Sequence, residues 1–98
     1  MYTATVVYEF REEAFEEACR IWEEEVLVLG QKQPGFVRMQ FLTAPPRAMA
    51  IGTWEDESCA QAFMQTGVFK TLLEKLKPLL TGEPRPQVWD LKYFAGLP

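Results

Sequence analysis

The stretch QPGFVRMQFLTAPPRAMAIGTWEDE, residues 33–57, predicts two β-strands joined by a proline-rich connection. We expect the strands at residues 36–42 and 48–54, where the side chains alternate between two faces. The two adjacent prolines within residues 43–47 cannot continue a strand ladder, so this segment is expected to be a loop or tight turn. A connection this short predicts an antiparallel hairpin.

A strand and a helix are predicted before this hairpin. Residues 3–10 are rich in β-branched and aromatic side chains, which is typical of a strand. From Arg11 to Gly30 the apolar residues recur at helical spacing, while glutamates occupy the outer face. Gly30 is a suitable residue to end this helix.

A second helical region and a last strand are predicted after the hairpin. Asp56 can cap a helix over residues 57–65, and Thr66-Gly67 interrupts it. Helical spacing resumes over residues 68–80, with Pro78 ending or bending the last turn. Residues 87–94 are then expected to form the final strand.

The order β-α-β-β-α-β predicts an α+β fold, a ferredoxin-like sandwich. In this fold a four-stranded antiparallel sheet carries both helices on one face. With 98 residues, the chain is expected to be a single domain spanning residues 1–98.

Both faces of the predicted sheet carry large apolar side chains, yet the helices can cover only one. The other face has an area on the order of 400 Å². Leaving it in water would forfeit about 10 kcal/mol, at roughly 25 cal/mol per Å². Since exposed patches of this size usually mark interfaces, we expect a two-fold symmetric homodimer.

Composition excludes several classes of function. The net charge is −4, and the basic residues are scattered among more numerous acids, so we expect no nucleic-acid partner. No apolar run reaches the length of a membrane span, and the first residues, MYTATVVYEF, do not resemble a signal peptide. A cytoplasmic protein is therefore expected.

The chain contains no His and no Asn. The absence of His removes the commonest metal ligand, the commonest general base and every Ser-His or Cys-His nucleophile arrangement. The two cysteines, Cys19 and Cys59, form no CxxC motif. We therefore expect neither a metal site nor a bound cofactor.

The element order, Pro34-Gly35-Phe36 at the start of the second strand, and Trp54-Glu55-Asp56-Glu57 before a helix resemble the antibiotic-biosynthesis-monooxygenase (ABM) domain family of the dimeric α/β-barrel superfamily. The resemblance covers nearly the whole chain. It implies a homodimer with a ligand cavity between the second helix and the sheet. It also implies a relation to oxygenases that act on phenolic compounds without metal or flavin, and to others that oxidise haem.

The spacing from Trp54 to Val68-Phe69-Lys70 is similar to the haem-degrading branch of this family, but the residues of that branch's site are absent. Leu73 stands where the branch has its iron-ligating His, and Phe63 stands in place of a Trp. Tyr8 lies near the position of the missing Asn. The sequence therefore argues against haem degradation.

Two hypotheses about function remain open from the sequence. In the first, the protein is a cofactor-independent monooxygenase of a small aromatic compound, with Tyr8 as the candidate catalytic residue. In the second, it is a non-catalytic dimeric module that binds a small apolar ligand. Either hypothesis uses the same expected pocket residues, which could alternatively be ordinary core: Trp54, Phe63, Met64, Phe69 and Leu73.

Overall fold

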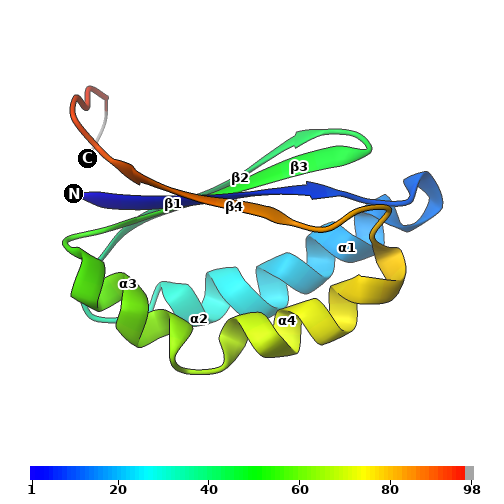
Figure 1. The fold of residues 1–98 in the computed structure, drawn as a ribbon, viewed down its shortest axis with the longest axis horizontal. Helices are drawn as coiled ribbons and strands as arrows, with labels where there is room; N and C mark the ends of the chain where they lie inside the picture. The colour runs from blue at the N-terminus through cyan, green and yellow to red at the C-terminus, as the bar shows by residue number, and fades with distance from the viewer. Residues whose placement is uncertain (97–98) are drawn as a thin grey trace.

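The computed structural model describes residues 1–96, which form a four-stranded antiparallel sheet with all the helices on one face (Figure 1). The spatial order of the strands is β2-β3-β1-β4, which confirms the predicted ferredoxin-like α+β fold. The strands are β1 (Tyr2–Glu9), β2 (Phe36–Ala44), β3 (Arg47–Trp54) and β4 (Arg85–Asp90).

The predicted helix from Arg11 to Gly30 is one helical segment that changes its winding. A 3₁₀ turn (Glu12–Ala14) leads into α1 (Phe15–Trp22), and a π-helical turn (Glu23–Leu27) separates α1 from α2 (Val28–Gly30). The second helical region comprises α3 (Glu57–Met64) and α4 (Val68–Leu76). Pro78 lies in a closing 3₁₀ turn (Lys77–Leu79), as its position predicts. No helix among residues 1–96 is long and apolar enough to cross a membrane.

The central hairpin is tighter than the sequence predicts. Strands β2 and β3 pair as far as Ala44 and Arg47, so only Pro45 and Pro46 connect them. The prediction that residues 43–47 form the whole connection was therefore wrong. Thr43, Ala44 and Arg47 retain backbone N–H groups that a ladder can use, and only the two prolines lack them.

The last strand also differs from its predicted position at residues 87–94, since β4 begins at Arg85 and ends at Asp90. It pairs only with β1, whose first residue, Tyr2, lies opposite Asp90. Beyond that point β1 offers one more backbone bond, from the N–H of Leu91 to the carbonyl of Met1 at 2.9 Å. The strand therefore ends where its partner strand ends. Pro86 is tolerated in β4 because this is an edge strand.

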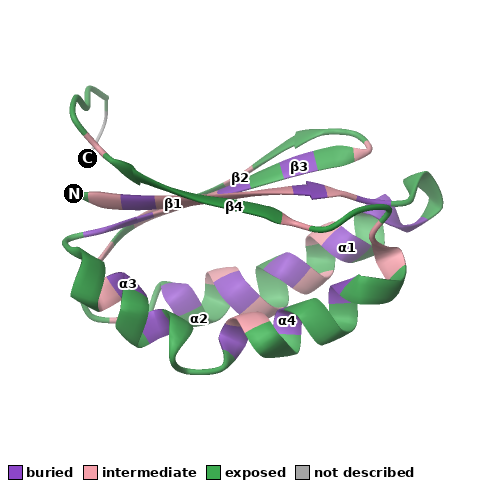
Figure 2. Cartoon of the chain, viewed as in Figure 1, coloured by how far each residue is buried: buried purple, intermediate pink, exposed green. Residues whose placement is uncertain are grey.

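The register of β3 places one side of each strand against the helices. On the side of β1 and β3 that faces the helices, Tyr8, Ala48, Ala50 and Trp54 are buried, whereas Tyr2, Ala4 and Gly52 are only half-buried. β4 is exposed along its length (Figure 2). The helices contribute the rest of the core. Its main members are Tyr8, Ala48, Ala50, Trp54, Ala18, Trp22, Val26, Phe63, Leu72 and Leu76.

The other face of the sheet carries no helix (Figure 1). Leu42, Met49 and Trp89 lie there, with 49%, 38% and 48% of their surface exposed. Some polar groups on this face are paired with one another: Thr3 and Thr53 share a hydrogen bond of 3.1 Å, and the indole of Trp89 donates to Thr5 Oγ1 at 2.9 Å. The open face thus combines exposed apolar side chains with polar ones such as Arg38 and Gln40.

Gly35 lies in the connection between α2 and β2, at a position where the backbone conformation and the space suit only a glycine. Its φ of 78° lies in the left-handed region, and a Cβ there would stand 2.7 Å from the Cβ of Cys59 in α3. Its carbonyl accepts the backbone N–H of Glu55 at 2.9 Å, next to Asp56, which caps α3 by accepting the N–H of Cys59 at 3.0 Å. The Pro-Gly-Phe and Trp-Glu-Asp-Glu motifs are therefore adjacent in the fold.

Replacing Gly35 by Ala should lower the free energy of unfolding more than replacing Gly67 by Ala. Gly67 also has a left-handed φ, of 86°, but a Cβ there meets nothing within 4 Å. We expect a loss of about 1 kcal/mol for Gly67→Ala, from backbone strain alone. Gly35→Ala should cost roughly 1–3 kcal/mol more because of the overlap with Cys59. Urea unfolding of both variants measures the difference, and equal losses would contradict this packing.

Candidate ligand-binding site

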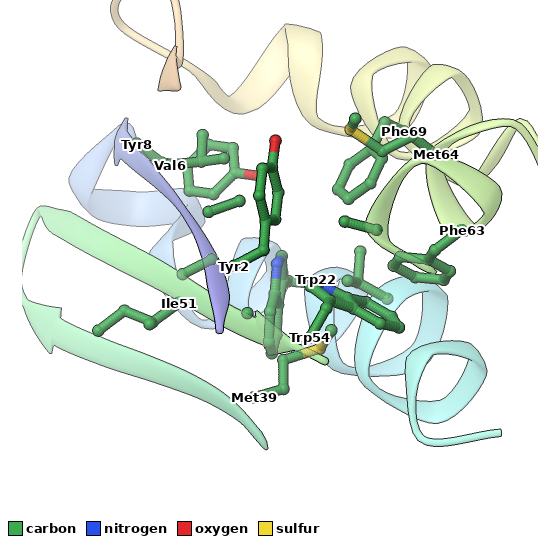
Figure 3. A pocket seen from close by; sticks show the side chains of 15 residues that line it. Tyr2, Val6, Tyr8, Trp22, Met39, Ile51, Trp54, Phe63, Met64 and Phe69 are labelled. Atoms are coloured by element: carbon green, nitrogen blue, oxygen red, sulfur yellow. The ribbon is translucent and has the colours of Figure 1, made fainter. Parts of the chain in front are cut away.

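A cavity of about 60 Å³ lies between the sheet and the helices. Its sheet side is formed where small residues pair across the strands, Ala4 with Gly52 and Val6 with Ala50. Ala4, Gly52 and Ala50 have little or no side-chain volume. A space therefore remains between this part of the sheet and the side chains of the helices. Figure 3 shows side chains from α1, α3 and α4 surrounding this space, while Ile51 points away from it.

A larger groove of about 1090 Å³ adjoins the cavity, between α4 and the strands β1 and β4. The two spaces lie next to each other, since they share lining residues on β1, α3 and α4: Tyr2, Ala4, Val6, Tyr8, Met64 and Phe69. Ligand sites for drug-sized molecules usually have volumes of about 300–1,000 Å³. The inner cavity alone is therefore too small for such a molecule, and a polycyclic ligand must extend into the groove.

The structure places all six residues singled out from the sequence around these two adjacent spaces. Trp54 and Phe63 line the inner cavity, Leu73 lines the groove, and Tyr8, Met64 and Phe69 line both. The aromatic rings are in mutual contact: the centroids of Trp54 and Phe63 are 5.1 Å apart, and those of Phe63 and Phe69 are 5.6 Å apart. These rings offer flat apolar surfaces, which suit an aromatic ligand.

The buried hydroxyl of Tyr8 stays protonated, so it can donate a hydrogen bond. Its side chain is 3% exposed, and its ring stacks on Phe10 with centroids 5.6 Å apart. Burial raises the pKa of the Tyr8 hydroxyl well above its ordinary value of 10.0. The neutral hydroxyl can donate to a ligand oxygen, whereas its raised pKa opposes a role as a general base.

Several cavity residues were not among the candidates from the sequence, and the largest of these side chains include Tyr2, Trp22, Val26 and Met39. Trp22 is the most informative, because its buried indole N–H has no hydrogen-bond partner among the described residues. A buried donor without an acceptor costs about 1–3 kcal/mol. Helical spacing places Trp22 on the apolar face of its helix, but no sequence pattern shows that an acceptor is missing.

The inner cavity has an uncharged lining. None of the described residues that line it is Asp, Glu, Lys or Arg, and residues 1–96 contain no cluster of three Cys, Asp or Glu side chains that could hold a metal. The two free cysteines are also held neutral. Burial raises the pKa of the Cys19 thiol, and a hydrogen bond with Asp56 raises that of Cys59. Cys19 and Cys59 do not line the inner cavity, and the uncharged side chains that do line it suit a neutral ligand better than an ion.

Comparison with known proteins relates the chain to others through its fold. No family model matches the sequence, and no curated protein matches it significantly. Among solved structures, an antibiotic biosynthesis monooxygenase matches with a TM-score of 0.80 and 14% identity, over 95% of this chain and all (100%) of that chain. Rv0793 from Mycobacterium tuberculosis matches with a TM-score of 0.83 and 8% identity, over 97% and 98% of the two chains.

One similar structure has a stated activity. SnoaB, a cofactor-independent oxygenase from Streptomyces nogalater solved in a mutant form, matches with a TM-score of 0.80 and 19% identity. The match covers 95% of this chain and 94% of that chain. The chain therefore has the fold of ABM domain proteins, as the sequence motifs predict, and at these identities the likeness establishes the fold.

The burial of Tyr8 has a measurable consequence for stability at high pH. The unfolded chain releases the Tyr8 proton near pH 10.0, whereas the folded chain retains it, so the free energy of unfolding falls as pH rises above 10.0. Tyr8 alone can contribute a slope of up to about 1.4 kcal/mol per pH unit. Tyr8→Phe should lose stability less steeply than the native protein in this window.

Urea unfolding at several pH values above and below 10.0 measures this slope. Tyr93→Phe, which removes a hydroxyl from a residue that is 83% exposed, is the matched control. If Tyr8→Phe and the native protein show the same dependence on pH, the hydroxyl is not buried as described.

Proposed function

We propose that this protein is a cofactor-independent monooxygenase of a small, uncharged aromatic compound. The observation that carries the proposal is the cavity between the sheet and the helices, which is lined by aromatic rings and uncharged donors. The likeness in fold to a cofactor-independent oxygenase supports it, since it shows that this architecture can host such chemistry. Function is assigned to the site, because a fold alone does not determine it.

The chemistry needs little from the protein if the substrate is easily oxidised. A methylene group between aromatic rings loses a proton, and the resulting carbanion reduces dioxygen. The CH₂ group becomes C=O, and the second oxygen atom leaves as water, so that CH₂ + O₂ gives C=O + H₂O. The substrate supplies all four electrons, and no external reductant is required. Binding and orientation of the substrate remain as the tasks of the protein.

The position of each lining residue indicates its role in the proposed reaction. Trp54, Phe63 and Phe69 stack on the aromatic rings of the substrate, while Met64 and Leu73 contact the part that extends into the groove. The neutral hydroxyl of Tyr8 donates a hydrogen bond to the substrate oxygen on which negative charge develops. Since no described residue of the inner cavity is a base, water entering through the groove accepts the proton.

The protein acts as a homodimer in this proposal, with the open faces of two sheets in contact. The sheet face has an area on the order of 400 Å², whereas a stable interface buries about 800 Å² on each partner. The segment after β4 must therefore contribute, and it carries the exposed side chains of Tyr93 and Phe94. Hydrogen bonds within the open face, such as that between Thr3 and Thr53, allow the groups that form them to be buried at little cost.

A non-catalytic ligand-binding dimer is the second candidate. The observation that favours it is the same uncharged lining, which supplies no general base. The second candidate needs only a small apolar ligand, and the two candidates are distinguished by whether oxygen is consumed.

Purified protein should accelerate the oxidation of anthrone by dioxygen, with consumption of one O₂ for each carbonyl formed. Tyr8→Phe should lower the rate about 100-fold, because a donor to the developing oxyanion is lost. Oxygen electrode traces and product absorbance measure the reaction, and Tyr93→Phe is the control. A native rate equal to that of buffer, with anthrone still bound, would leave the non-catalytic module as the function.

Sedimentation velocity at micromolar concentration should give the mass of a dimer. Met49→Glu places a charge in the middle of the open face and should produce a monomer, because an unpaired buried charge is strongly unfavourable. Thr71→Glu, which adds the same charge to an exposed position of α4, should leave the dimer intact. A stable monomer of the native protein would refute the dimer.

A further inference from the structure

The indole N–H of Trp22 is a buried polar group without a role in the fold. Trp22 is 3% exposed and stacks on Phe41, with ring centroids 4.5 Å apart. Its Nε1 is the buried side-chain nitrogen or oxygen that finds no hydrogen-bond partner among the described residues. A phenylalanine would pack in a similar way without leaving a donor unpaired, so packing alone does not explain the indole.

The backbone around Trp22 is also unusual. The π-helical turn Glu23–Leu27 begins directly after Trp22, and Val26 within it lines the same cavity. Turns of this kind are rare and are frequently found at functional sites. Trp22 reaches the cavity from the helix layer, whereas Trp54 reaches it from the end of β3 (Figure 3).

We infer that Trp22 is a specificity-determining residue whose N–H donates a hydrogen bond to a neutral carbonyl oxygen of the ligand. This inference rests on the proposed aromatic ligand and adds the chemical group by which that ligand is recognised. A carbonyl fits because four side chains that line the inner cavity, those of Trp22, Trp54, Tyr2 and Tyr8, carry a hydrogen-bond donor, and none of the lining side chains is cationic. A carboxylate or phosphate would enter this lining without a balancing charge.

The shape of the site then fixes the orientation of the ligand. The inner cavity, at about 60 Å³, has room for a carbonyl and the ring atoms next to it, while the rest of the molecule occupies the groove. The carbonyl end is therefore buried and the opposite end faces the side chains of Leu73 and Leu76. A hydrocarbon of the same shape can occupy this space but leaves the Trp22 N–H unpaired.

Two probes that differ in one oxygen test the inference: α-tetralone, a bicyclic aromatic ketone, and tetralin, the same bicycle without the oxygen. Their aromatic rings produce similar ring-current effects in NMR spectra. The chain has three tryptophans, so three indole N–H signals are observable. We expect α-tetralone to shift the Trp22 signal strongly downfield, as hydrogen bonding does, and tetralin to leave it nearly unchanged.

Affinities of variants give a second measurement. Trp22→Phe should weaken the binding of α-tetralone about tenfold, which corresponds to about 1.4 kcal/mol, and should change tetralin binding little. Trp89→Phe is the matched control, because the Trp89 N–H donates to Thr5 on the open face, and it should alter neither affinity. Assignment of the NMR signals uses the same two variants.

The outcomes separate this inference from the proposed function. Equal effects of both probes on Trp22, or equal loss of both affinities in Trp22→Phe, would overturn the role of Trp22 while leaving an aromatic site in place. Binding of neither probe to the native protein would overturn both. Binding of α-tetralone through Trp22 without any oxidation of anthrone would support the inference and reject the oxygenase.

Discussion

The register of β3 between β1 and β2 is the constraint on which the other features depend. It pairs Ala4 with Gly52 and Val6 with Ala50, so several small residues lie side by side on the face of the sheet that the helices cover. A slip of one residue would turn Met49 and Ile51 toward the helices and expose Ala50 and Trp54. The cavity, the aromatic lining and the apolar side chains exposed on the open face are all consequences of this one alignment.

The cavity carries two energetic costs that a ligand can remove. An apolar space of 60 Å³ costs about 1–2 kcal/mol, at roughly 24 cal/mol per Å³. The unpaired N–H of Trp22 adds about 1–3 kcal/mol. Together these are a sizeable fraction of the stability of a small domain, which is typically about 5–15 kcal/mol. A neutral aromatic ketone would offset both costs at once, so the cavity and the proposed ligand have one physical explanation.

Much of the fold could be predicted from the sequence, because alternation and helical spacing report directly on which side chains are buried. The pocket positions of Phe63, Phe69 and Leu73 followed from helical spacing and family resemblance. The end of β4 could not be predicted, since it is set by where β1 begins and not by residues 91–94 themselves. Trp22 was missed for a related reason: an indole on an apolar helix face looks the same in sequence whether or not its N–H finds an acceptor.

A crystal structure of the protein with anthrone tests the central claim most directly. The account predicts the tricyclic ring between β1 and α4, with its carbonyl oxygen about 2.7–3.2 Å from the Nε1 of Trp22 and its far ring in the groove beside Leu73. Anthrone bound elsewhere, or a cavity filled by the protein's own side chains with no ligand present, would contradict it.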